Sequence, residues 1–269
     1  GDLVSARMGA RAGASQTRGV IVGGYPHPSP TVNTMEYVTI PSTGNTQDFG
    51  DLNYAPTYFT ASSNSTRGIT FGGTTDGGTP GASDTMDYFT IPSKGNARDF
   101  GNLGANNYYN ASVASPTRAI QAGGGIHPAY YNLMEYVTIA TTGNAKDFGD
   151  LNIIMSNHTG CSNSTRGLLA GGYNPSTPQI ASIVYTTIAS MGNTIEFGDL
   201  TIGRSGLAAC SSSNRGLFAA GVAASPISGN CNIIDYVTIA TTSNALDFGD
   251  MNNARNQVGG LSNGHGGLG

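Results

Sequence analysis

Two stretches decide the fold: residues 17–24, TRGVIVGG, and residues 35–52, MEYVTIPSTGNTQDFGDL. Both recur four more times along the 269 residues. The arginine of the first stretch returns after 49, 51, 48 and 49 residues, at Arg18, Arg67, Arg118, Arg166 and Arg215. In every copy a tyrosine precedes a phenylalanine by 12 residues, as Tyr37 precedes Phe49. Constant offsets of this kind establish an internal repeat of about 49 residues.

Each repeat unit contains four strand-like segments. In the first unit these are the apolar run 18–23, the alternating run 35–40, a segment around Phe49, and the Ala-, Ser- and Thr-rich run 54–63. The Gly44-Asn45 turn suits a tight hairpin, because glycine tolerates positive φ. No window shows a 3.6-residue apolar period, so helices should be scarce. Four strands per unit are typical of a propeller blade, and small residues suit the crowded innermost strand.

The sequence therefore predicts an all-β fold in which residues 1–269 form a single five-bladed β-propeller with four antiparallel strands per blade. The expected blades are 5–52, 53–103, 104–151, 152–200 and 201–251, followed by an extra C-terminal segment, 252–269. Gly1-Asp2-Leu3 resemble the end of DFGDL, and residues 253–269 resemble a sixth innermost strand. We expect the N-terminal strand to complete blade 1 and the C-terminal segment to pack outside or lead elsewhere. These partial units also suggest a piece of a longer chain.

An apolar run, a glycine pair and two spaced aromatic residues together resemble the kelch repeat, over nearly the whole chain. The resemblance implies a β-propeller. The chain departs from the kelch pattern in having Phe where kelch has Trp, and in the long variable gap after the glycines. The YVTI and DFGDL segments are similar to repeats in structural proteins of tailed bacteriophages, including marine ones, which implies a virion structural protein.

Composition argues against several classes of partner. Charged residues make up 10% of the chain and the net charge is −4, so we expect no nucleic-acid partner. No apolar stretch reaches about 18 residues, so we expect no membrane insertion. Three cysteines are an odd number for a disulfide framework, and we expect free, core-filling thiols. The four histidines show no zinc-ligand spacing, so the sequence predicts no metal and no cofactor.

The repeat also separates structural residues from candidate site residues, because a residue present in every blade is structural by default. The five repeated arginines are predicted to tie neighbouring blades through carbonyls or a carboxylate, with the repeated acids as natural partners. Of the 16 acids, 13 occupy repeat positions and Asp2 lies in the N-terminal segment that resembles the end of DFGDL, so only Asp76 and Asp84 remain. Little remains for a pair of catalytic carboxylates, so we predict no catalytic residues and no enzymatic activity.

Variation is concentrated in the loops that follow the glycine pairs. These loops occupy the same place in each unit, so they should project from one face, where recognition usually resides. The candidate binding residues in them are Tyr25, His27, Asp76, His127, Tyr130, Tyr131, Tyr173 and Asn174.

The function expected from these features is a non-enzymatic virion or cell-surface module for structure and adhesion, with an extracellular or virion-surface location. Its partners would be other structural proteins or a host-surface receptor or glycan, and self-assembly is a further possibility. The alternative is a multivalent, lectin-like carbohydrate-binding propeller with one weak site per blade. Against that alternative, the chain has no Trp to stack on sugars.

Overall fold

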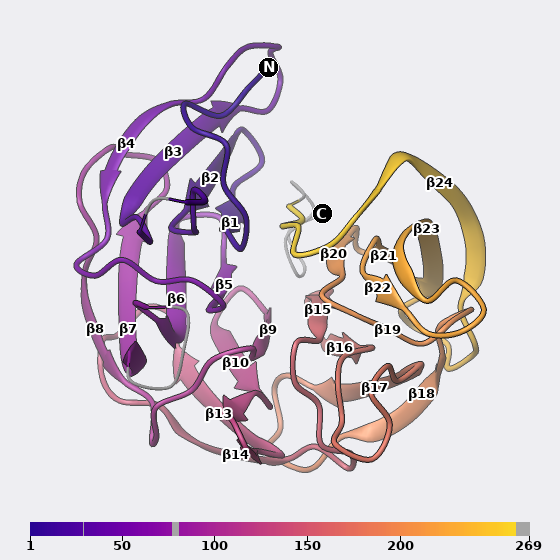
Figure 1. Ribbon diagram of the computed structural model, residues 1–269. Coiled ribbons are helices and arrows are strands. Elements are labelled where there is room, and N and C mark those ends of the chain that lie inside the picture. The colour runs from indigo at the N-terminus through magenta and orange to yellow at the C-terminus, as the bar shows by residue number, and fades with distance from the viewer. Residues whose placement is uncertain (29, 77–80, 262–269) are drawn as a thin grey trace.

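The computed structural model describes residues 1–28, 30–76 and 81–261, and within these ranges the protein is all-β without an α-helix. Five antiparallel four-stranded sheets surround a central axis, which confirms the predicted five-bladed propeller (Figure 1). Residues 262–269 of the predicted C-terminal segment lie outside the described residues.

Within each blade the four strands follow one another in the order expected from the repeat. They are β1 (Arg11–Ala14), β2 (Arg18–Val22), β3 (Thr34–Thr39) and β4 (Gln47–Asp51) in blade 1; β5 (Thr60–Ser63), β6 (Arg67–Thr74), β7 (Ala82–Thr90) and β8 (Arg98–Asn102) in blade 2; β9 (Ala111–Ala114), β10 (Arg118–Ala122), β13 (Leu133–Thr138) and β14 (Lys146–Asp150) in blade 3; β15 (Thr159–Ser162), β16 (Arg166–Ala170), β17 (Ser182–Thr187) and β18 (Ile195–Asp199) in blade 4; and β20 (Ala208–Ser211), β21 (Arg215–Ala219), β23 (Gly229–Thr238) and β24 (Leu246–Arg255) in blade 5. Four short strands lie in the connections: β11 (Gly125–Ile126), β12 (Ala129–Tyr130), β19 (Arg204–Ser205) and β22 (Val222–Ala223).

The small-residue strands β1, β5, β9, β15 and β20 lie nearest the axis, and successive members contact one another (Figure 1). Their small side chains allow this approach, and so does the glycine that follows each repeated arginine but one. A Cβ at Gly167, for example, would lie 2.5 Å from Cγ2 of Val113 in the preceding blade. Close packing of blades at the axis therefore fixes the residue sizes in these two strands.

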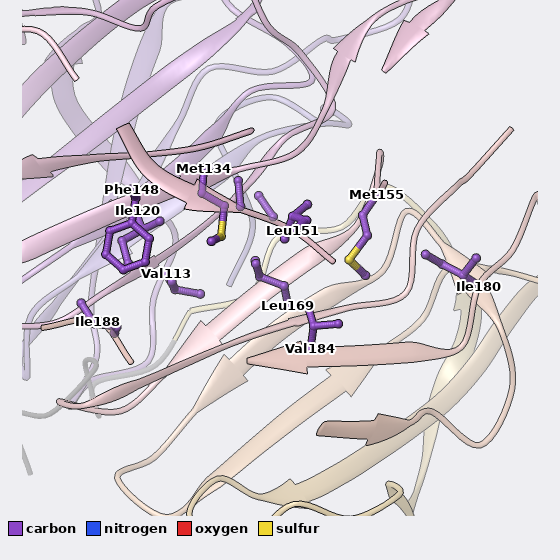
Figure 2. Packing of buried hydrophobic residues seen from close by; sticks show 12 residues of the cluster. Val113, Ile120, Met134, Phe148, Leu151, Met155, Leu169, Ile180, Val184 and Ile188 are labelled. Atoms are coloured by element: carbon purple, nitrogen blue, oxygen red, sulfur yellow. The ribbon is translucent and has the colours of Figure 1, made fainter. Parts of the chain in front are cut away.

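The hydrophobic core is divided into four clusters, one between each pair of successive blades from 1 to 5. Figure 2 shows the cluster between blades 3 and 4, where Phe148, Ile120 and Met134 of blade 3 face Leu169 and Val184 of blade 4. The repeated phenylalanine is thus the residue that each blade presents to the next one.

Each repeated arginine from blades 1 to 4 reaches a main-chain carbonyl of the next blade. Arg118 Nη1, for example, donates to Ile188 O at 2.9 Å and to Ala189 O at 3.1 Å. Its guanidinium also lies 4.4 Å from the ring centroid of Tyr136, whose ring meets Phe148 edge-on. Arg215 stacks on Tyr236 in the same way, but among the described residues no carbonyl accepts from its side chain. The arginines therefore join blades through carbonyl oxygens.

Replacing Arg118 with methionine is expected to lower the free energy of unfolding by about 1–3 kcal/mol, because two charge-assisted hydrogen bonds between blades are lost. The matched change Arg215→Met should cost about 1 kcal/mol or less, since that guanidinium is exposed and loses only its contact with Tyr236. Urea unfolding of both variants measures the difference. Equal losses would contradict the role of the inter-blade bonds.

The repeated acids are not the partners of these arginines, so that part of the prediction is wrong. The acids that precede the repeated phenylalanine, such as Asp48 and Asp147, are exposed. The acids that precede the repeated tyrosine are buried instead, and they accept main-chain N–H groups from the segment that leads into the innermost strand of the same blade. Asn53 N donates to Asp87 Oδ2 at 2.9 Å, and burial raises the pKa of Asp87 while these hydrogen bonds partly offset the rise.

The two chain ends behave differently from each other. Strand β1 pairs with β2, so the N-terminal strand completes blade 1 as expected. The C-terminal segment does not pack outside the ring, as one of our expectations had it. Beyond β24 the chain turns in toward the axis (Figure 1), where Gln257 N donates to Gly206 O at 2.9 Å and Gly9 N donates to Gln257 O at 3.3 Å.

Candidate functional site: a tyrosine cluster on the loop face

The loops that follow the glycine pairs lie on the same face of the ring as the segments that lead into the innermost strands. Isolated antiparallel bridges join the two, for instance between Tyr108 and Gly125 and between Ser156 and Tyr173. Gly124 must be glycine here, because its φ is +84° and a Cβ would lie 2.7 Å from Tyr108 O. We call this side of the propeller the loop face.

Two tyrosines on the loop face have left-handed backbone conformations next to the axis. Tyr58 has φ of +54° and Tyr109 has φ of +58°, values that residues other than glycine rarely adopt. Tyr109 N donates to Tyr58 O at 2.7 Å, and Asn157 N donates to Tyr109 O at 2.7 Å. The side chains of both tyrosines are therefore held by a hydrogen-bonded backbone around the axis.

Five tyrosines from blades 2, 3 and 4 gather on this face, and we call them the tyrosine cluster: Tyr58, Tyr108, Tyr109, Tyr130 and Tyr173. Ring centroids are 4.5 Å apart for Tyr58 and Tyr109, 5.1 Å for Tyr108 and Tyr109, and 5.5 Å for Tyr130 and Tyr173. His127 connects the two groups, because its main-chain N–H donates to the Tyr108 hydroxyl at 3.2 Å and its ring meets Tyr130 edge-on.

The environment of the cluster raises the pKa of two of its hydroxyl groups, those of Tyr109 and Tyr130. Burial raises the pKa of Tyr109, and neighbouring tyrosines, first Tyr58, raise it further. Burial also raises the pKa of Tyr130, as do Tyr173 and Tyr108. Protonated hydroxyls can both donate and accept, so the cluster offers aromatic surface together with hydrogen-bonding groups.

A cation lies beside the cluster on the axial side. Arg11 of β1 lines the central channel with Asn110 and small residues of the other innermost strands. Burial lowers the pKa of Arg11 to about 10, and Tyr109 counteracts part of that effect. The guanidinium therefore remains charged at neutral pH, so the loop face combines tyrosines with a positive charge at the channel.

Of the predicted loop residues, the structure brings His127, Tyr130 and Tyr173 together and places the others apart. Tyr25 and His27 form a separate edge-on pair on blade 1, with ring centroids 5.7 Å apart.

The remaining three predicted residues make local contacts. Asn174 builds its own turn, since its Nδ2 donates to Ile154 O and its Oδ1 accepts from Ser176 N. Asp76 accepts from the Thr74 hydroxyl at 2.8 Å, and Tyr131 N donates to Gly124 O at 2.9 Å.

Tyr58, Tyr108 and Tyr109 were absent from the predicted site, because all of the predicted residues lie in the variable loops that follow the glycine pairs. A signal for two of them was present in the sequence. Tyr58 and Tyr109 occupy one repeat position, nine residues before the repeated arginine, where the other blades have Gly9, Asn157 and Gly206. A bulky residue in two of five copies is the kind of exception that marks a candidate site.

His158 is a second buried group, placed between blades 3 and 4. A Cβ at Gly123 would lie 2.8 Å from its Cε1, and neither ring nitrogen has a hydrogen-bond partner in the part of the chain that the structure describes. Burial lowers the pKa of His158 from 6.5 to about 3. Phe59 stands at the same repeat position in blade 2, so His158 occupies a packing position.

His158 should make stability depend on pH. The unfolded chain binds a proton near pH 6.5 and the folded chain near pH 3, so the stability present above pH 6.5 is lost as pH falls through this window. The slope is about 1.4 kcal/mol per pH unit. We expect His158→Phe to reduce the stability lost between pH 6.5 and 4.5 by about 2–3 kcal/mol, measured by urea unfolding. An unchanged pH dependence would show that folded His158 is readily protonated.

The cysteines and metal-ligand residues add no further site. Cys161, Cys210 and Cys231 are free, and Cys231 lies in β23. Residues 1–28, 30–76 and 81–261 contain no group of three or more His, Cys, Asp or Glu residues that could hold a metal.

The same ranges contain no helix that is long and apolar enough to cross a membrane. Compared with protein-family models and with curated proteins, the sequence matches none.

Proposed function

We propose that this propeller is a non-enzymatic module for structure and adhesion, of kelch-like type, which displays its loop face on a virion or at a cell surface. The tyrosine cluster is the observation that carries the proposal. Rigid aromatic side chains with hydroxyl groups supply large contact area at little entropic cost, and tyrosine is enriched among the residues that dominate binding at protein interfaces. The five blades hold this surface in place through inter-blade carbonyl bonds and four core clusters.

A lectin-like role is the second candidate, and the cluster changes its form. Tyrosine rings can pack on a sugar ring in place of the missing tryptophan. Because the cluster is built by non-equivalent residues of blades 2, 3 and 4, it would make one composite site rather than one weak site per blade.

The test is binding of the labelled protein to a glycan array and to intact cells. The double variant Tyr130→Ala/Tyr173→Ala is expected to bind at least about tenfold more weakly, as for loss of a hot spot. The control is Tyr25→Ala, which removes a partly buried loop-face tyrosine outside the cluster. Binding to cells but not to glycans would favour a protein receptor. Equal binding by both variants would contradict a role for the cluster.

A further inference from the structure

Six of the described residues, one more than the number of blades, surround the propeller axis at equivalent positions with a left-handed backbone. Their φ angles lie between +51° and +67°, and they are Gly9, Tyr58, Tyr109, Asn157, Gly206 and Gln257. Each N–H in the series from Tyr109 to Gln257 donates to the carbonyl of the preceding member, and Gly9 N donates to Gln257 O. Five of these six residues belong to complete blades, and the sixth is Gln257 of the C-terminal segment.

The residues after Gln257 also take the place of an innermost strand. Leu261 follows Gln257 by four residues, as Cys161 follows Asn157. A Cβ at Gly216 of blade 5 would lie 2.8 Å from Cys161 Sγ of the preceding blade, and a Cβ at Gly19 of blade 1 would lie 3.2 Å from Leu261 Cδ2. Residues 257–261 therefore stand where the innermost strand of a blade between blades 5 and 1 would stand.

The face of blade 5 that is equivalent to the inter-blade faces of blades 1 to 4 is exposed. Phe248 is 52% exposed, whereas the other four repeated phenylalanines are 1–3% exposed. An open groove of about 500 Å³ lies beside it, lined in part by Leu217, Ile234, Met251 and Val258. The next blade supplies a carbonyl acceptor to each of the other four repeated arginines, but no carbonyl of the described residues accepts from the Arg215 side chain.

Blade 1 presents the complementary surface. Ile40 is partly exposed, although its four counterparts in the other blades are at most 1% exposed. Asp2 O accepts from Thr46 N at 3.0 Å, just as Asp51 O accepts from Ala97 N at 2.8 Å between blades 1 and 2. Residues 1–4 thus already occupy the place of a segment that follows a repeated phenylalanine.

From these contacts we infer that the opening between blades 5 and 1 is a docking slot for a polypeptide that carries one more copy of this repeat, from its arginine strand as far as its repeated phenylalanine. Its apolar residues would cover Phe248, its carbonyls would accept from Arg215, and its own arginine would donate to Ile40 O. A whole second copy fits less well, because its chain continues beyond the repeated phenylalanine, and residues 1–4 already hold the place of those following residues.

The direct probe is a synthetic peptide of residues 165–197, which contains β16, β17 and the first three residues of β18 and ends at the repeated phenylalanine Phe197. We expect it to bind the full chain and to raise its melting temperature. The matched control peptide carries Leu169→Asp and Ile188→Asp on the face that meets the preceding blade. On the protein side, Phe248→Glu changes an exposed residue and is expected to weaken binding at least about tenfold.

A second experiment addresses the case in which the free peptide does not bind because it is unfolded in solution. Residues 162–197 are joined directly after Leu261, and this fused copy is expected to raise the melting temperature by about 5 °C or more. The same fusion with Leu169→Asp and Ile188→Asp should give no rise. Failure of both the peptide and the fusion would overturn the inference. Self-association of the unmodified chain that Phe248→Glu abolishes would also overturn it, in favour of a second copy as the occupant.

Discussion

Replacing Phe148 with alanine is expected to lower the free energy of unfolding by about 3–5 kcal/mol. Its ring is 1% exposed and fills the cluster between blades 3 and 4, so the truncation leaves a cavity that the surrounding sheets can close only partly (Figure 2). The equivalent change in blade 5, Phe248→Ala, should cost about 1 kcal/mol or less, because half of that side chain already contacts water.

The two phenylalanines occupy the same repeat position, stand in the same DFGD sequence and meet a tyrosine edge-on at nearly the same distance. Urea unfolding of both variants therefore isolates the effect of the neighbouring blade. If Phe248→Ala were as costly as Phe148→Ala, the surface of blade 5 would have to be covered in solution.

Breaking the buried ion pair of blade 5 is the second change with a large expected effect. Arg204 Nη1 and Asp235 Oδ2 are 2.9 Å apart, and both side chains are fully buried. Replacing Asp235 with valine leaves the fully buried guanidinium without its carboxylate. We expect a loss of about 3–5 kcal/mol in the free energy of unfolding, and a similar loss for Arg204→Met.

Blade 4 supplies the control for this experiment. Met155 and Val184 stand at the same two repeat positions and belong to the cluster between blades 3 and 4. The double variant Arg204→Met/Asp235→Val is expected to be more stable than either single variant, because no uncompensated charge remains. Asp235 also accepts from Thr201 N, and in blade 4 the Thr194 hydroxyl accepts the equivalent bond. Adding Ala245→Thr should therefore recover further stability. Additive losses would contradict the pairing.

The repeat made the fold predictable, because each offset encodes one physical requirement. The Tyr-to-Phe spacing places two aromatic rings edge-on across a hairpin, as Tyr136 and Phe148 show. The glycine after the arginine marks the close approach of blades. The partner of the arginine was harder to predict, since carbonyl oxygens leave no trace in the sequence whereas acids do.

The candidate site and the C-terminal segment were less predictable, for two physical reasons. The tyrosine cluster joins residues from three blades, and only the backbone around the axis brings Tyr109 beside Tyr58. The five repeated arginines indicate five units. A sixth position at the axis needs only a left-handed residue such as Gln257 and the short segment after it, without an arginine. The arginine belongs to the second strand of a blade and does not report on the innermost one.

Electron microscopy of the native particle that contains this chain tests the proposed role most directly. We expect the propeller to be a repeated part of a regular assembly, with Tyr130 and Tyr173 of the loop face directed to the outer surface or to a partner. A lone monomeric ring, with the loop face in contact with nothing and no binding to cells or glycans, would contradict it.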